Sequence, residues 1–373
     1  MDGRPKRFAL AVLVFLAFGA VFAQDVPGDS PPPSLQIQLI RAVARGDVGQ
    51  TAALLSAGAD PKKALMTAVV KGQAETFRLL VQAGAPLTGP EGTGSDLLGM
   101  ALFGSNAKVQ EREAQRQKER AVQGKEVLPT ANGFDDIIAL LLENGVPADS
   151  PQETGLTPLM MAAMYGNEKA AALLLEHGAD PGRELAGEGW TVLHMAAQFG
   201  HWGVVQAILK AGSSADKADK AGRTPLMLAA CGGEGAALQR LLGGEDTNFF
   251  FVQETCGKEF LETVQTLLER GADPNRADEN GVTPLLAAST AGNLGIARAL
   301  LEAGAAPNLG DGQGRTPLMA AAKAGKPALV ELLLSRGADP KAVALDGTTA
   351  LTLARAGKNR EVLRLLRHAL QKE

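Results

Sequence analysis

The residues of this chain whose side chains could do chemistry are few and widely spaced. The four histidines are His177, His194, His201 and His368. A zinc site needs several nitrogen or sulfur ligands at suitable spacings. His194 and His201 are seven residues apart, with no cysteine or cluster of carboxylates beside them. The histidines therefore predict no metal site, and nothing else in the sequence predicts a cofactor.

Two other stretches have only a superficial likeness to ligand sites. Residues 273–278 suggest a calcium loop, but the acidic ladder and the distal glutamate of such a loop are not at the required offsets. Residues 310–314 contain three glycines, but no lysine follows to hold a phosphate. No serine or cysteine stands in a recognisable nucleophile elbow. We therefore predict no catalytic residue and a protein that is not an enzyme.

The first residues of the chain predict a targeting segment. Three basic residues precede an apolar run at 8–23, which ends in small residues that suit a signal peptidase. Its 16 residues fall short of the roughly 20 that span a bilayer as a helix. We expect residues 1–23 to be a cleaved signal peptide, with a membrane anchor as the alternative. The proline-rich residues 24–34 then form an extended linker, and no later segment is apolar enough to span a membrane.

The two cysteines of the chain, Cys231 and Cys256, flank a segment that contains three consecutive phenylalanines. In an exported protein, an even pair of cysteines is typically bonded. A bridge over this separation contributes roughly 3 kcal/mol to stability in the loop-entropy estimate. We predict a Cys231–Cys256 disulfide. The alternative is a small buried residue at Cys231 and an unrelated thiol at Cys256.

Composition narrows the classes of partner. Lys and Arg number 37 against 41 Asp and Glu, which leaves a net charge of −4 and no basic field for nucleic acid. Hydrophobic residues make up 45% of the chain but aromatic residues only 4%. The core is therefore predicted to be aliphatic and built from small side chains.

From about residue 35 onward the chain is one repeating pattern. Glycines of Gly-Ala-Asp-Pro stretches alternate with segments such as GRTPLMLAA at 222–230 and GRTPLMAAA at 314–322. The threonines of these segments are 34, 33, 59, 33 and 33 residues apart. A period of 33 with this paired signature resembles the ankyrin repeat family. The resemblance implies an all-α solenoid of helix-turn-helix units with projecting β-hairpin fingers over residues 35–373.

The repeated residues have physical roles. Thr224, Thr283 and Thr316 can cap a helix, and the proline after each suits the first helical position. The glycine of each Gly-Ala-Asp stretch can end the second helix in a left-handed conformation. The family resemblance further implies that His194 braces neighbouring turns by hydrogen bonding. We count about nine units, including atypical caps at both ends.

Three irregularities interrupt the period. Near the start, a glycine spacing of 26 predicts that the finger between Asp60 and Ala64 is missing. An insertion at about 105–132 is highly charged and predicts a solvated helix or loop, with a partner-docking arm as the alternative. An insertion at about 234–258 carries the phenylalanines. We expect these rings to fold back onto the repeats, and an exposed patch for a partner is the alternative.

The resemblance implies a scaffold that grips a protein partner with its fingers and the exposed ends of its first helices. Trp and Tyr are favoured interface anchors, so we favour binding over the alternative that these rings pack laterally along the fingers. Nine residues occupy the variable positions of that face in this sequence: Leu156, Met164, Tyr165, Trp190, Gln198, Phe199, Arg223, Val282 and Arg315.

We therefore expect an exported, monomeric binding scaffold in a bacterial periplasm. Its partner is a protein of unspecified identity, and we expect neither nucleic acid nor, after signal cleavage, a membrane span. Two alternatives stay open. One is a secreted effector that docks on a host protein, and the other is an enzyme with a site in the phenylalanine-rich insertion.

Overall fold

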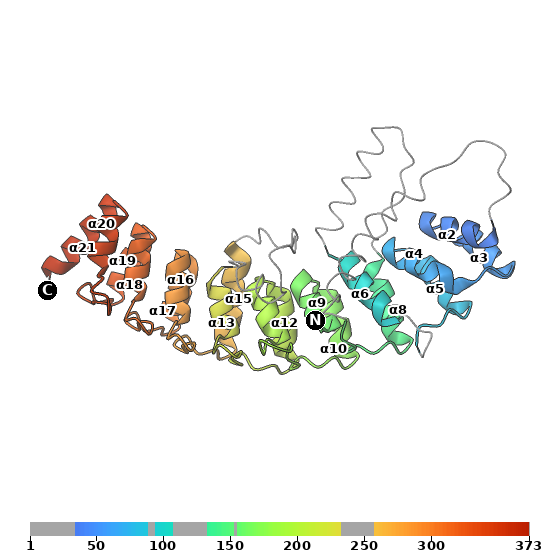
Figure 1. Cartoon of the computed structure of the whole chain (residues 1–373), viewed down its shortest axis with the longest axis horizontal. Coiled ribbons are helices and arrows are strands. Elements are labelled where there is room, and N and C mark those ends of the chain that lie inside the picture. The colour runs from blue at the N-terminus through green and yellow to red at the C-terminus, as the bar shows by residue number, and fades with distance from the viewer. Residues whose placement is uncertain (1–33, 89–93, 107–132, 153–154, 233–256, 373) are drawn as a thin grey trace, which may run out of the picture. The chain divides into compact units, whose positions relative to one another are not determined.

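The computed structural model describes residues 34–88, 94–106, 133–152, 155–232 and 257–372 (Figure 1). The chain divides into two compact units, Met1–Asp180 and Pro181–Glu373, which we describe separately. Within the described ranges the regular structure is helical, apart from one isolated antiparallel bridge between Glu184 and Thr191. The predicted all-α fold is confirmed. None of the described helices combines the length and the apolar character that a membrane span requires.

The described residues of the first unit form four helix pairs. The first helices of the pairs pack against one another in one row, and the second helices pack in a parallel row. The pairs are α2 (Leu35–Arg45) with α3 (Val48–Ser56), α4 (Leu65–Val70) with α5 (Ala74–Gln82), α6 (Gly94–Gly104) with α8 (Phe134–Glu143), and α9 (Pro158–Tyr165) with α10 (Glu168–Glu176).

The start of this unit departs from the repeat as the sequence predicts. Between α3 and α4 the chain forms only a short 3-10 helix, η1 (Pro61–Ala64), whose first turn is capped by the carboxylate of Asp60. This short turn stands where a finger would otherwise project, which confirms the missing finger. Ser34 caps α2, and its hydroxyl accepts a hydrogen bond from the backbone of Ile37.

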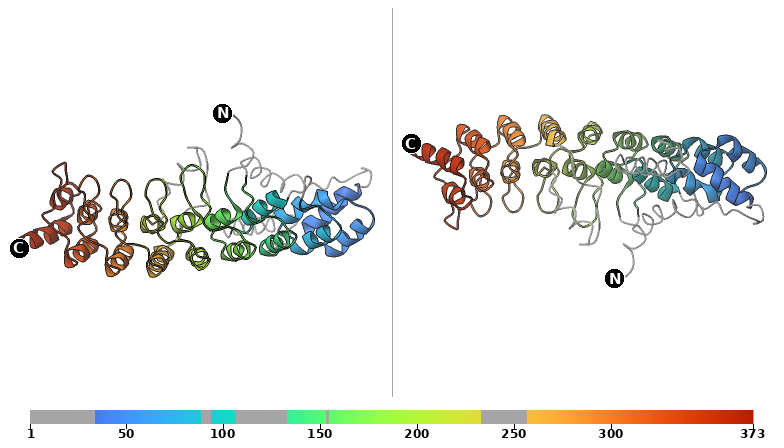
Figure 2. Two further views of the ribbon diagram at one scale, coloured as in Figure 1. Left: turned by 90° about the horizontal axis from the view of Figure 1, so that it is seen from below. Right: turned by 90° about the horizontal axis from the view of Figure 1, so that it is seen from above.

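The described residues of the second unit form five helix pairs. These pairs again lie in two rows (Figures 1 and 2). Together with the four pairs of the first unit they match the predicted nine repeats. The pairs are α11 (Val192–Gln198) with α12 (Trp202–Lys210), α13 (Pro225–Ala230) with α15 (Gly257–Glu269), α16 (Pro284–Ala291) with α17 (Leu294–Glu302), α18 (Pro317–Lys323) with α19 (Pro327–Ser335), and α20 (Ala350–Ala356) with α21 (Arg360–Lys372).

The local signals of the sequence form the helix ends as predicted. The hydroxyls of Thr224, Thr283 and Thr316 accept hydrogen bonds from the backbone three residues on, and a proline occupies the first turn in each case. The Gly-Ala-Asp glycines that follow the second helices lie in the left-handed region, as at Gly212 with φ 94° and Gly304 with φ 92°. A residue with a Cβ is strained in this region. The position of the glycine therefore determines where the second helix of each repeat ends.

The core of each unit is aliphatic. Buried leucine, alanine and valine side chains fill the space between the two helix rows, and the largest fully buried side chains are Trp190 and Phe77. Alanines on the first helices, such as Ala196 and Ala229, are completely buried and let neighbouring first helices approach closely. The predicted signal peptide and linker residues 1–33 and nearly all of both insertions lie outside the described residues. The second insertion was placed to about residue 258, and α15 already begins at Gly257.

Candidate partner-binding face

Each middle finger of the second unit is a tight turn built around an aspartate. The backbone N–H of Asp219, Asp278 and Asp311 donates to the carbonyl four residues on, at 2.9, 3.0 and 3.1 Å. One carboxylate oxygen of each aspartate also accepts the backbone N–H groups two and four residues on, at 2.8 to 3.0 Å. The turn is therefore held by the side chain as well as by the backbone, and its conformation is fixed before any partner arrives.

Neighbouring fingers are joined by a ladder of backbone hydrogen bonds. The N–H of the first tip residue of each finger donates to the carbonyl of the second tip residue of the finger before it. The fingers consequently project as one row (Figure 2), with a repeat distance set by the backbone. The donor and acceptor pairs are Lys220 and Glu188 at 3.0 Å, Glu279 and Ala221 at 3.1 Å, Gly312 and Asn280 at 2.7 Å, and Leu345 and Gln313 at 2.9 Å.

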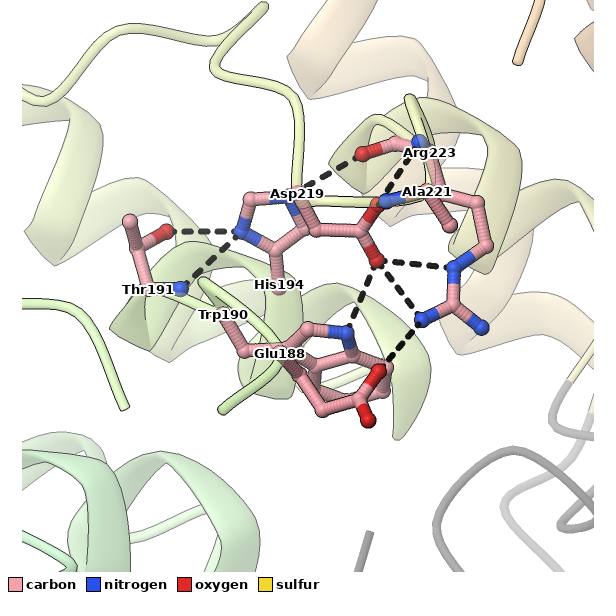
Figure 3. Close-up of polar contacts among 7 residues, drawn as sticks. All are labelled: Glu188, Trp190, Thr191, His194, Asp219, Ala221 and Arg223. Carbon is pink, nitrogen blue, oxygen red and sulfur yellow. Dashed lines mark hydrogen bonds and ion pairs between the residues drawn. The ribbon is translucent and has the colours of Figure 1, made fainter. Parts of the chain in front are cut away.

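The first two fingers of this row meet at a buried carboxylate (Figure 3). The side chain of Asp219 is 0% exposed, and its second oxygen accepts hydrogen bonds from Trp190 Nε1 at 2.9 Å and from Arg223 Nε and Nη2, both at 2.7 Å. The guanidinium of Arg223 lies over the ring of Trp190, 5.6 Å from its centroid, and its Nη2 also approaches Glu188 at 3.5 Å. A buried carboxylate with this many donors is stable only while its partners remain.

His194 links the two repeats at the same place. Its Nδ1 accepts a hydrogen bond from the backbone N–H of Thr191 at 3.1 Å, and its Nε2 lies 3.2 Å from the carbonyl of Arg223. These partners require a neutral ring that carries its proton on Nε2. Burial of the ring lowers the pKa of His194 to about 4. The bracing role that the family resemblance implied for His194 is confirmed.

The Asp219–Arg223 pair recurs at Asp311 and Arg315, without a tryptophan beside it. Arg315 Nε and Nη2 donate to one oxygen of Asp311 at 2.7 and 2.6 Å. Partial burial opposes ionisation of Asp311, but the hydrogen bonds from the side chain and backbone of Arg315 outweigh it and lower the pKa of this carboxyl. The side chain of Arg315 is 61% exposed, so it presents a fixed positive charge to solvent.

The structure corrects the exposure expected for five of the nine predicted contact residues. Trp190 is fully buried because its ring stacks on His194, is covered by Arg223 and is hydrogen-bonded to Asp219. The large ring of Trp190 therefore packs inside the fingers. This is the lateral packing that the sequence analysis gave as the alternative to partner binding. The others pack in or next to first helices and are buried: Leu156, Met164, Gln198 and Phe199.

The other four predicted contact residues reach the surface to different extents. Arg315 is exposed, whereas Arg223 and Val282 are half-buried; all three directly precede a capping threonine of a first helix in the second unit. Tyr165 ends α9 in the first unit, where it is half-buried with its ring edge-on to that of Phe103, 6.0 Å away. Burial raises the pKa of Tyr165. Their role as contacts stays a prediction.

The sequence analysis missed the bracing role of the finger aspartates Asp219, Asp278 and Asp311, and it considered Asp278 only as part of the stretch 273–278. Each stands three residues before the glycine of the threonine motif, and their spacings of 59 and 33 repeat those of the threonines. This shared spacing indicates that the aspartates have a structural role in every repeat that carries one. It was overlooked because an aspartate near a turn is common and usually solvated, whereas Asp219 and Asp311 are buried.

The remaining candidates for chemistry stay apart. Cys231 is half-buried at the C-cap of α13, and Cys256 lies outside the described residues, so the disulfide stays a prediction. In the described ranges, no group of three histidine, cysteine or acidic side chains is placed to hold a metal ion.

Comparison with known proteins identifies the repeats. The sequence model of the family described as ankyrin repeats (3 copies) matches residues 113–185, 179–250 and 252–344. The matched ranges cover more than half of the chain, which therefore belongs to the ankyrin repeat family. Ankyrin repeats imply a protein-interaction scaffold, and the preformed row of fingers agrees with that function.

Several curated proteins are similar to parts of the chain. The ankyrin repeat and KH domain-containing protein mask-1 of Caenorhabditis elegans is 30% identical over 46% of the chain and 6% of its own length. The human ankyrin repeat domain-containing protein 63 is 33% identical over 33% of the chain and 35% of its own length. The putative E3 ubiquitin-protein ligase XBAT31 of Arabidopsis thaliana is 40% identical over 27% of the chain and 25% of its own length. The matched part of the chain thus spans only 6% to 35% of the length of these relatives.

Proposed function

We propose that this protein is an exported, non-catalytic scaffold that binds a protein partner through the row of fingers of its second unit. The observation that carries the proposal is the hydrogen-bonded ladder between the fingers. A surface whose backbone is already ordered loses less conformational entropy when it binds, so more of its contact energy appears as affinity. A row of this kind suits recognition of another macromolecule better than catalysis.

The contacts that the structure favours are polar. Arg315 and the tip residues Lys220 and Glu279 are exposed on three different fingers, and Arg223 is 25% exposed in its side chain. We assign direct contact to these residues and to the half-buried Val282. Trp190 contributes indirectly, because its ring and Nε1 hold Asp219 and Arg223 in place.

Export is proposed from the sequence alone. The basic residues before an apolar run at 8–23 favour a signal peptide, and the predicted disulfide suits an oxidising compartment. Fractionation of cells that express the tagged chain tests this proposal. We expect release of the protein by osmotic shock and a mature N-terminus at Gln24. Retention in the cytosol with residues 1–23 attached would refute the periplasmic assignment.

The binding surface is tested by site-specific crosslinking. A photoreactive amino acid is placed at Glu279, at the tip of a finger, and as a control at Arg364, an exposed position of α21. Crosslinking in the extracytoplasmic fraction is expected to give one discrete adduct from Glu279 and none from Arg364. The reverse pattern would move the interface to the second helices.

A matched pair of arginine variants tests the individual contact. Arg315 is 61% exposed and Arg364 is 75% exposed, and each forms an ion pair with a nearby carboxylate. Arg315→Ala is expected to weaken binding of the crosslinked partner about tenfold, as for a moderate interface contact, whereas Arg364→Ala leaves it unchanged. Equal effects of the two variants would show that the finger face is not the site.

A further inference from the structure

Two arginines of the second unit are held in the same way by the turn aspartate of their own finger. Arg223 donates from Nε and Nη2 to one oxygen of Asp219, both at 2.7 Å. Arg315 donates from the same two nitrogens to one oxygen of Asp311, at 2.7 and 2.6 Å. The side chains of the two aspartates are only 0% and 5% exposed. Each aspartate therefore fixes its guanidinium from the protein side.

These contacts occupy one edge of each guanidinium and leave a second edge. The group has five N–H donors in a planar fork, and the aspartates use the edge formed by Nε and Nη2. Among the described residues, Nη1 of neither arginine forms a hydrogen bond or an ion pair. Figure 3 shows this nitrogen of Arg223 pointing away from Asp219 and Glu188. The edge formed by Nη1 and Nη2 can bind a further carboxylate through two parallel hydrogen bonds.

The finger ladder sets the distance between the two arginines. Both stand four residues after the turn aspartate, and the finger between them carries Val282 at that position. Hydrogen bonds join the two arms of each finger and also join each finger to the next. Because hydrogen-bonded strands lie about 4.8 Å apart, one finger step is about 10 Å and two steps are about 19 Å. The arginines therefore form a fixed pair of cations with an apolar side chain between them.

The exposed charges around this pair are of both signs. They include Lys220 and Arg276, which are positive, and Glu188, Glu279 and Asp346, which are negative. A mixed surface of this kind has no strong field that attracts every acidic chain. Like charges that meet across an interface also disfavour wrong registers. Recognition by the arginine pair therefore depends on where the acidic groups of a ligand are placed, and less on its total charge.

We propose that Arg223 and Arg315 bind two carboxylates of one extended segment of the partner protein, which runs along the fingers and places an uncharged residue over Val282. In an extended chain, side chains six positions apart lie on the same face, about 20 Å from each other. The acidic residues of the segment are therefore six positions apart. This inference rests on the proposed scaffold function and names the chemistry of the segment that is bound.

The exposure of Arg223 favours an extended segment over a helix. Its side chain is 25% exposed, because the finger before it covers part of the guanidinium. A helix is about 10–12 Å across with its side chains, whereas a single extended chain occupies about 5 Å. The narrower chain can approach this partly covered edge and Arg315 at the same time.

The probe is a random library of twelve-residue peptides displayed on phage and selected against the full chain. Arg315→Lys keeps the positive charge and loses the planar fork. Arg364→Lys is the matched control, because Arg364 is 75% exposed and also pairs with a nearby carboxylate. Both positions are exposed, so both variants are expected to fold, which tryptophan fluorescence checks.

We expect enriched peptides in which two acidic residues are six positions apart. A synthetic peptide of this kind should bind Arg315→Lys about tenfold more weakly than wild type, because a bidentate charged pair is lost. Its binding to Arg364→Lys should be unchanged. Moving one acid by a single position turns its side chain to the other face of the segment and should weaken binding to a similar extent.

Amide replacements in the peptide show which acid meets which arginine. Replacing one acid by its amide should remove the difference between wild type and Arg315→Lys, whereas replacing the other should leave that difference unchanged. Equal binding to wild type and Arg315→Lys, acidic residues at no fixed spacing, uncharged or basic peptides, or no enrichment would overturn the proposal. Displacement of the peptide by short single-stranded DNA of equal or higher affinity would indicate a phosphate ligand and would also overturn it.

Two further outcomes separate this inference from the scaffold function. If the partner crosslinked at Glu279 binds Arg315→Lys as tightly as wild type, the carboxylate assignment is wrong while the scaffold stands. If no partner is crosslinked at Glu279 but the peptides depend on Arg315 and on their spacing, the arginine pair stands as a site for acidic segments without the proposed contacts of the finger tips.

Discussion

The burial of His194 is expected to make the second unit less stable at mildly acidic pH. In the folded protein the ring is buried and neutral, and desolvation, the dominant cause, lowers its pKa to about 4 from the ordinary 6.5. The carboxylates of Asp219 and Glu184 act in the opposite direction, and the charge of Arg223 acts in the same direction as burial. Between pH 6.5 and about 4 the unfolded chain therefore binds a proton that the folded chain does not.

The sign and size of the effect follow from linkage. Stability rises with pH wherever the unfolded state holds more protons, so this contribution is complete above pH 6.5 and is lost as the pH falls toward 4. The full difference of about 2.5 pKa values corresponds to about 3 kcal/mol. Between pH 7 and pH 5 the loss is about 2 kcal/mol, a large part of the stability of a typical domain.

Tryptophan fluorescence provides the assay. Both tryptophans of the chain, Trp190 and Trp202, lie in the second unit, so their emission follows urea unfolding of that unit. His194→Gln removes the titrating ring and keeps an acceptor and a donor, and His368→Gln removes an exposed histidine as a control. The free energy of unfolding of wild type and of His368→Gln should fall by about 2 kcal/mol more than that of His194→Gln between pH 7 and pH 5. The same pH dependence in all three proteins would refute the reasoning.

Four further predictions concern the same repeats. Asp219→Ala should lower the free energy of unfolding by about 3–5 kcal/mol, because the buried indole N–H of Trp190, the guanidinium of Arg223 and two finger N–H groups lose their shared acceptor. Asp278→Ala should lower the free energy of unfolding by about 1–2 kcal/mol, because only backbone hydrogen bonds to the carboxylate are lost. If urea unfolding gives equal losses for Asp219→Ala and Asp278→Ala, the side-chain partners of Asp219 do not add to stability. Trp190→Phe should cost about 1–3 kcal/mol, measured by fluorescence of Trp202, because the indole N–H to Asp219 is lost. It should weaken partner binding, measured by titration, no more than Arg223→Ala does; a larger binding defect in fully folded protein would contradict the indirect role of Trp190. The Cys231–Cys256 disulfide predicts a mass two hydrogens below that of the dithiol, and a reduction-sensitive stability of roughly 3 kcal/mol.

The features that the sequence predicted best are the helix ends, because they depend on residues that are close together in the chain. A capping threonine, a proline in the first turn and a glycine that tolerates positive φ act within a few residues, so the threonines at 224, 283 and 316 and the glycines at 212 and 304 marked helix ends correctly. The missing finger between Asp60 and Ala64 followed from the same spacing. These residues have one physical role wherever they occur in the repeat.

What the sequence did not predict depends on contacts between repeats. Trp190 stands at a position that varies, and its burial results from Asp219 and Arg223 of the next finger, 29 and 33 residues away. Nothing in the residues around Trp190 signals those partners. The aromatic ring was therefore interpreted as a surface anchor, whereas the structure places it inside the fingers, where it contacts Asp219 and Arg223.

Because of the hydrogen-bond ladder, the position of a finger does not depend on the number of residues between it and the finger before it. The carbonyl of Ala221 and the N–H of Glu279 are 58 residues apart in sequence, against 32 at the other three steps, yet their hydrogen bond of 3.1 Å is like the others. The additional residues that the sequence has between α13 and α15 therefore do not change the hydrogen bond between the fingers on either side of them. This segment can therefore lengthen, shorten or be replaced by a reporter domain while the spacing of the finger surface on both sides of it stays the same.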